Sequence, residues 1–162
     1  MLEFLSLKFI CVAGLALYLS IVAINNITDP ATNLGLIIRM MQMEEIKQDP
    51  TMGNGLEWRA LHSTFVPKAS FYFIVVYQVV TAILLWRGAY FLLATIFGNA
   101  TLPQAIAAAN IGLGAFALIW IGFICGGLWF GYWMKMGPGQ QTHMTLLILS
   151  MLAILIINLV PA

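Results

Sequence analysis

The sequence predicts an all-α integral membrane protein in which four transmembrane helices form a single domain over residues 1–162. Composition is the first observation: hydrophobic residues make up 62% of the chain and charged residues only 8%, whereas a soluble domain has about 25% charged residues. The second observation is that four apolar runs are long enough to cross a bilayer, which takes about 20 residues in a helix. Because the net charge is only +1, nucleic acid is not an expected partner.

The four predicted spans cover residues 7–24, 70–93, 107–133 and 144–159. Each must be helical, because the bilayer core holds no water to satisfy the backbone N–H and C=O groups. An even number of crossings brings both termini to one side, which we call side A. The opposite side, side B, then receives the long loop of residues 25–69 and the short loop of residues 135–143.

The long loop is predicted to contain a helix at about residues 30–46. Asp29 directly precedes Pro30, a pair that is typical of the start of a helix. Apolar residues from Leu34 to Met41 then recur at helical spacing. This pattern indicates an amphipathic helix that lies on the membrane surface or covers the end of the bundle.

The third predicted span is rich in glycine. Gly122 and Gly126 form one pair of small residues four positions apart, and Gly127 and Gly131 form another. Such pairs allow two helix backbones to approach closely within a membrane. We therefore expect these glycines to line a close helix contact, either inside the four-helix bundle or with a partner chain.

A polar stretch, GLEWRALHST, precedes the second span. Trp58 is expected at the membrane–water interface, where tryptophan is enriched. Arg59 is expected to pair with a loop carboxylate, Asp29 or Glu57, or with a lipid phosphate or a partner chain. No Ser/His/Asp or Cys/His arrangement accompanies these residues, so we interpret the stretch as an anchoring element and predict no catalytic residue.

Side B also collects residues that can bind metals. His62 and His143 are expected at similar depth there, where two imidazoles can ligate the iron of haem b. Thioether sulfurs select Cu(I), and the methionines expected at side B include Met41, Met43, Met134 and Met136. Methionine also fills gaps in apolar surfaces. No cofactor is therefore predicted, and copper and haem stay open as alternatives.

Six stretches follow one another along the chain: NNITDPATN, RMMQMEE, LEWRAL, TAILLWRGAYFLL, WIGFICGGLWF and GPGQQ. Their order resembles that of a bacterial family of small integral membrane proteins, the domain of unknown function 2165 family. The resemblance implies four helices in the bacterial cytoplasmic (inner) membrane, with cytoplasmic termini and a periplasmic loop at residues 25–69.

The distribution of basic residues indicates the opposite orientation. Basic residues favour the cytoplasmic side, and side A carries only Lys8 and Arg87, while side B carries Arg39, Lys47, Arg59, Lys68 and Lys135. The long loop balances its bases with acidic residues, and we follow the resemblance.

The chain also departs from the family it resembles. Where the family tends to carry carboxylates, this chain has Gln78, Leu128 and Gln141. An ionisable residue inside a membrane is a candidate functional site, so proton or ion chemistry is not expected here. A small transporter also fits less well, because polar residues near the midplane are few and no internal repeat is visible.

These features predict a non-catalytic accessory or stabilising subunit of a larger membrane protein complex, such as an energy-converting complex of the respiratory, photosynthetic or monooxygenase type. The expected partners are other membrane protein subunits and lipids. The alternative is a copper- or haem-binding membrane protein that uses the histidines and methionines of side B.

Overall fold

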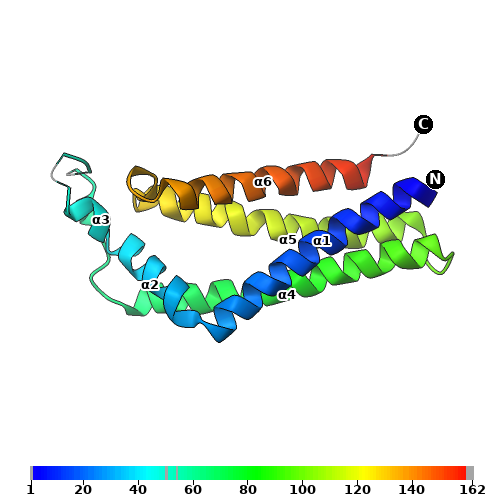
Figure 1. Cartoon of the computed structure of the whole chain (residues 1–162), viewed down its shortest axis with the longest axis horizontal. Helices are drawn as coiled ribbons and strands as arrows, with labels where there is room; N and C mark the ends of the chain where they lie inside the picture. Colours follow the sequence, from blue (N-terminus) through cyan, green and yellow to red (C-terminus); the bar gives the residue numbers. More distant parts are fainter. Residues whose placement is uncertain (1, 50, 54, 160–162) are drawn as a thin grey trace.

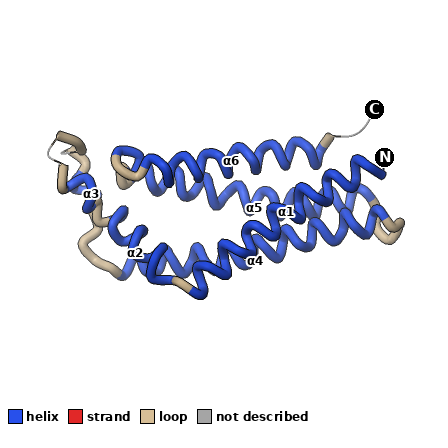
Figure 2. Tube along the Cα trace, viewed as in Figure 1, coloured by secondary structure: helices blue, strands red, loops and turns tan. Residues whose placement is uncertain are grey.

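The structure is a computed structural model that describes residues 2–49, 51–53 and 55–159. This part of the chain consists of α-helices and two short 3-10 turns, without strands (Figure 1; Figure 2). In chain order the elements are α1 (Leu2–Thr28), α2 (Pro30–Met41), α3 (Glu44–Lys47), η1 (Glu57–Arg59), α4 (Phe65–Ile96), α5 (Leu102–Trp129), η2 (Tyr132–Met134) and α6 (Gly137–Asn158).

Four of these helices, α1, α4, α5 and α6, are long and apolar enough to cross a membrane. They confirm the predicted all-α integral membrane protein. The predicted spans lie inside these helices, except that α5 ends at Trp129 instead of residue 133 and α6 ends one residue early. The early end of α5 follows from Gly131, whose φ of 67° is the left-handed conformation that often terminates a helix.

The start of α1 and the end of α6 lie at side A, and the connection between α1 and α4 lies at side B (Figure 1). Consecutive long helices pack as neighbours, α1 on α4, α4 on α5 and α5 on α6. At side A, Lys8 also joins α1 to α6, because its Nζ donates hydrogen bonds to the carbonyl oxygens of Ile157 at 2.6 Å and Leu159 at 2.8 Å. Carbonyls at the end of a helix lack partners within the helix, so the buried Lys8 side chain completes the end of α6.

Helices α4 and α5 approach each other closely at two glycines. A Cβ atom on Gly88 would lie 2.8 Å from the Cα of Ala109, and one on Gly112 would lie 2.9 Å from the backbone nitrogen of Leu85. No side chain fits at either position. The two backbones therefore touch in the half of the bundle nearer side A, as small residues allow within a membrane.

The close contact predicted at four glycines of α5 and its end is not found within the described chain. A Cβ atom on Gly122 or Gly126 would meet no atom within 4 Å. Gly127 instead faces the ring of Tyr132, and Gly131 forms the turn that follows the helix. The prediction of intramolecular packing was wrong because the four-residue spacing identifies small residues but not the face that meets a neighbour. Contact with a partner chain stays a prediction.

The long loop folds into a cap at side B. We define the side-B cap as α2, α3 and η1 together with η2 (Figure 2). Asp29 begins α2 as predicted, since its carboxylate accepts hydrogen bonds from the hydroxyl of Thr32 at 2.6 Å and from the Thr32 N–H at 3.4 Å. The single helix predicted at residues 30–46 is instead two, because Met43 adopts a φ of 55°, which few residues other than glycine do.

Burial of apolar side chains holds the side-B cap together. Its small core consists of the buried side chains of Met43, Ile46, Ala60 and Phe130. An ion pair between Asp49 and Lys135 joins the segment after α3 to the segment after η2. Hydrogen bonding to the Lys135 ammonium holds the pKa of the Asp49 carboxyl well below its usual value, so the pair stays charged at neutral pH.

Candidate functional site

A groove of about 370 Å³ opens beneath the side-B cap, and we call it the side-B groove. Its floor comes from α4 and α5, and its walls come from α1 with α2 on one side and from α6 on the other. Figure 1 shows α1 and α6 separating toward side B. All residues lining the groove belong to the described part of the chain, and none of them is charged.

A chain of amide side chains crosses the groove from the cap to the floor. Asn33 of α2 donates a hydrogen bond to the side-chain oxygen of Asn26 on α1. Asn26 in turn donates to the side-chain oxygen of Gln78 on α4 at 2.8 Å. Asn26 and Gln78 are buried, and a buried amide is costly unless it is hydrogen-bonded. The three neutral amides therefore fix α2 against α1 and α4.

A cluster of aromatic side chains, three of which carry polar atoms, also lines the groove. The ring of His143 stacks on Trp120 and on Tyr132, each with centroids 6.0 Å apart, and lies 4.8 Å from the ring of Phe123. We call these four residues the His143 cluster. Its members come from α5, η2 and α6, so the cluster depends on the turn that brings α6 back against α5.

Three polar atoms of the His143 cluster have no hydrogen-bond partner, although they are buried. They are Trp120 Nε1, Tyr132 Oη and His143 Nδ1. Only 3% of the Trp120 surface and 5% of the Tyr132 surface is exposed. Burial raises the pKa of the Tyr132 hydroxyl, so this group stays a neutral donor. Buried polar groups are nearly always paired, which makes three unpaired atoms in one cluster the most unusual polar feature of the groove.

A second groove, of about 580 Å³, lies between α4 and α5, and we call it the outer groove. It is lined by Ala69, Ser70, Phe73, Ile74, Tyr77, Leu118, Ile119, Gly122 and Phe123. Ile74, Gly122 and Phe123 also line the side-B groove. The helices α4 and α5 therefore part around Gly122, where the sequence predicted a close contact.

Comparison with protein families gives a match that covers nearly the whole chain. The family model described as "Predicted small integral membrane protein (DUF2165)" matches residues 4–160. The chain belongs to this family. No curated protein and no solved structure matches it. The family assignment confirms the resemblance seen in the sequence, and the site must be interpreted from its own geometry.

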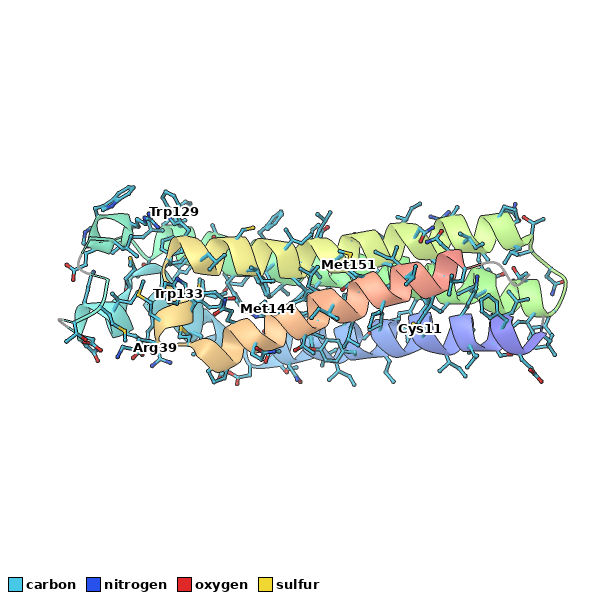
Figure 3. The ribbon with its side chains drawn as sticks, turned by 90° about the horizontal axis from the view of Figure 1, so that it is seen from above. Cys11, Arg39, Trp129, Trp133, Met144 and Met151 are labelled. Atoms are coloured by element: carbon cyan, nitrogen blue, oxygen red, sulfur yellow. The ribbon has the colours of Figure 1, made fainter. Side chains whose placement is uncertain are left out.

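The polar loop stretch of this DUF2165 member contacts the end of α5. Arg59 Nη1 donates a hydrogen bond to the backbone carbonyl of Trp129 at 3.2 Å. The guanidinium carbon lies 4.6 Å from the centroid of the Trp129 ring and 5.3 Å from that of Trp58, within range of a cation–π interaction. Figure 3 shows Trp129 at the cap end of the bundle. The stretch thus holds the loop against α5.

The carboxylate partner predicted for Arg59 was wrong within the described chain, while a lipid phosphate or a partner chain stays a prediction. Neither Asp29 nor Glu57 forms an ion pair with it, since the salt bridges among the described residues are Arg39–Glu45 and Asp49–Lys135. Arg59 binds a helix end instead, because carbonyls in the last turn of a helix lack partners and carry partial negative charge. Trp58 is 72% exposed, as suits a side chain at the headgroup level.

The structure separates the candidate metal ligands of this DUF2165 protein into three places. His143, Met41 and Met136 line the side-B groove. Met43 lies in the small core of the cap, and Met134 packs against that core, as Met41 also does. His62 is exposed outside the groove. Within residues 2–49, 51–53 and 55–159, no three His, Cys, Asp or Glu side chains form a metal-holding group. Among the predicted ligands in the described chain, the imidazole of His143 and the thioethers of Met41 and Met136 share the lining of one groove.

Replacing Arg59 by alanine is expected to loosen the cap. The change removes a hydrogen bond from a charged group, worth about 1.5–3 kcal/mol, at a partly exposed site where solvent reduces that value. We expect faster limited proteolysis of residues 48–56 in detergent micelles. His62→Ala, which alters an exposed side chain of the same loop, is the control and should leave the cleavage rate unchanged. Equal acceleration in both variants would contradict the anchoring role of Arg59.

Proposed function

We propose that this DUF2165 member is a non-catalytic accessory subunit that stabilises a larger membrane protein complex, such as an energy-converting complex of the respiratory, photosynthetic or monooxygenase type. The outer groove is the observation that carries the proposal. It is an apolar recess of about 580 Å³ on the transmembrane surface, and side chains of the described chain leave it unfilled.

The proposed occupant of the outer groove is a transmembrane helix of a partner subunit. Gly122 lies exposed in the groove with no atom within 4 Å of its Cβ position, which leaves room for a partner's side chain. Within a bilayer, helices associate through close van der Waals packing at such small residues, because lipid removes the hydrophobic drive between them. A partner helix would fill the recess more completely than mobile acyl chains do.

The test compares Gly122→Leu with Gly114→Leu on the same helix. Both glycines have no atom within 4 Å of the Cβ position, but only Gly122 lines the outer groove. After gentle extraction from native membranes, we expect the wild-type chain and Gly114→Leu to migrate in a stoichiometric complex on native gels, and Gly122→Leu to migrate alone. A wild-type chain that migrates alone, or equal behaviour of both variants, would refute the proposal.

The proposed location is the bacterial cytoplasmic membrane, with cytoplasmic termini and a periplasmic side-B cap. We expect His62→Cys to react with a membrane-impermeant thiol reagent added to intact cells, and Asn99→Cys to remain unlabelled. Both positions are exposed and lie in loops at opposite ends of the bundle. Cys11 and Cys125 are replaced by serine in the background. Labelling of Asn99→Cys alone would reverse the orientation and support the count of basic residues.

A copper-binding membrane protein is the second candidate function, because His143 lines the side-B groove together with Met40, Met41 and Met136. Thioether and imidazole ligands suit Cu(I). Elemental analysis of the purified protein tests it: stoichiometric copper that is lost in His143→Ala supports the second candidate. A haem absorption band that is lost in the same variant supports haem b instead.

A further inference from the structure

The His143 cluster lacks partners for three polar atoms, and these atoms limit what the side-B groove can bind. The indole N–H of Trp120 can only donate a hydrogen bond, and the neutral hydroxyl of Tyr132 can donate another. A ligand that pairs these two donors must therefore offer acceptors. Because both residues are at least nine-tenths buried, a bond to either is shielded from competing water, and in such surroundings it is strong.

The charge and shape of the groove further restrict the class of ligand that it can bind. None of its lining residues is charged, so a phosphate or ammonium group would enter without a counter-charge, at high cost. Rings line the pocket from several helices, including those of Tyr18, Phe71, Trp120 and Phe123. Flat aromatic groups pack well against such rings in stacked or edge-to-face arrangements. The preferred ligand is therefore neutral, flat and conjugated.

The position of the groove favours a ligand that reaches it through the membrane. The walls include the transmembrane helices α1 and α6, which separate toward side B (Figure 1). A volume of about 370 Å³ lies within the range of sites for small organic molecules. It accommodates a substituted ring, while an apolar tail leaves between the helices.

We propose that the side-B groove binds a lipid-soluble quinone by its ring, with the carbonyl oxygens accepting hydrogen bonds from Trp120 Nε1 and Tyr132 Oη. Both donor atoms are buried, so binding includes a rotation of side chains in the His143 cluster, a change that is common when ligands bind. A saturated acyl chain would fill the same space without pairing either donor. The proposal concerns binding alone and does not depend on a partner subunit.

The probe is tetramethyl-1,4-benzoquinone, and its control is 1,2,4,5-tetramethylbenzene, a flat molecule with the same six-membered carbon skeleton and four methyl groups but no carbonyl oxygens. Both are measured by equilibrium dialysis against the purified full chain in lipid nanodiscs, with protein-free nanodiscs subtracted. We expect saturable 1:1 binding of the quinone and binding of the hydrocarbon that is weaker by roughly 10-fold or more, because two hydrogen bonds are lost. Equal binding of both compounds, or no saturable binding of the quinone, would overturn the proposal.

Four variants locate the site, of which two change the groove and two are controls. Gly126→Leu places a side chain in the groove at a position with no atom within 4 Å and should abolish binding. Gly114→Leu, on the same helix but outside the groove, should leave it unchanged. Tyr132→Phe removes one donor and should weaken binding roughly 3- to 10-fold. Tyr90→Phe, at a tyrosine that is 65% exposed on α4, is its control and should have no effect.

Thermal unfolding of each variant keeps these results interpretable. A loss of binding is attributed to the site only in a variant whose melting temperature matches that of the wild type. If Gly126→Leu is unstable, Tyr132→Phe is the variant that tests the site. Unchanged affinity in both folded variants would overturn the assignment of the site. The measurement uses the isolated chain, so a missing partner subunit and a missing quinone site give separate results.

Discussion

Gly112→Leu should prevent stable folding. A Cβ atom at this position would lie 2.9 Å from the Leu85 nitrogen and 3.0 Å from the carbonyl carbon of Leu84. These are backbone atoms of α4, which cannot rotate away, so α5 must separate from α4 to admit the side chain. Overpacking typically lowers the stability of a protein by about 1–3 kcal/mol where side chains can adjust. Because backbone atoms cannot adjust in this way, we expect the destabilisation of this variant to be at or above the upper end of that range.

Gly114→Leu is the matched control for Gly112→Leu, because it adds the same side chain two residues away, at a position with no atom within 4 Å. Unfolding by SDS, followed by circular dichroism in mixed micelles, measures both variants. We expect Gly112→Leu to unfold at much lower SDS or to fail to accumulate in membranes, and Gly114→Leu to resemble the wild type. Equal midpoints would show that α4 and α5 do not touch there.

Lys8→Met should detach the end of α6. The ammonium group of Lys8 donates to two carbonyl oxygens of α6 and its C-terminal extension, and methionine keeps the apolar stem but donates nothing. Hydrogen bonds from a charged group are worth about 1.5–3 kcal/mol. We expect a loss of that size in the free energy of unfolding, measured by the same SDS titration.

Lys68→Met is the control for Lys8→Met, since Lys68 is exposed near the start of α4. Surface substitutions usually change stability by less than about 0.5 kcal/mol. Hydrogen exchange locates the effect: faster exchange in the last two turns of α6 is expected in Lys8→Met only. Uniform exchange in all three proteins would mean that Lys8 does not hold the helix end.

The number and class of the helices could be predicted from the sequence, because membrane solvation acts on each segment separately. An apolar run must form its own hydrogen bonds in lipid, whichever helix lies beside it. The start of α2 was predictable for the same reason, since Asp29 needs only the nearby Thr32 to begin the helix. These features depend on local sequence.

The side-B groove and its lining residues could not be predicted in this way, because they depend on which faces of the helices pack against one another. The spacing of Gly122 and Gly126 suggests a close contact as strongly as that of Ala108 and Gly112, yet only the latter region meets α4. The partner of Arg59 was missed because it is a backbone carbonyl seventy residues away. The break at Met43 was missed because few methionines adopt a positive φ. The side-B groove arises from the separation of helices, which no residue pattern records.

The placement of these helix contacts makes the bundle behave as two pairs of helices, here called arms, that are joined near side A. The pair α1–α4 and the pair α5–α6 meet in close contacts at Gly88, at Gly112 and through Lys8, and both grooves lie on the side-B part of the arms. Gly112 therefore acts as a pivot, with about 25 Å of α5 beyond it at 1.5 Å per residue. A relative tilt of about 5° would displace the far end of α5 by about 2 Å. The bond from Arg59 to Trp129 and the ion pair of Asp49 with Lys135 span the arms at or beyond that far end, so these two contacts act at the greatest leverage on how far both grooves can widen.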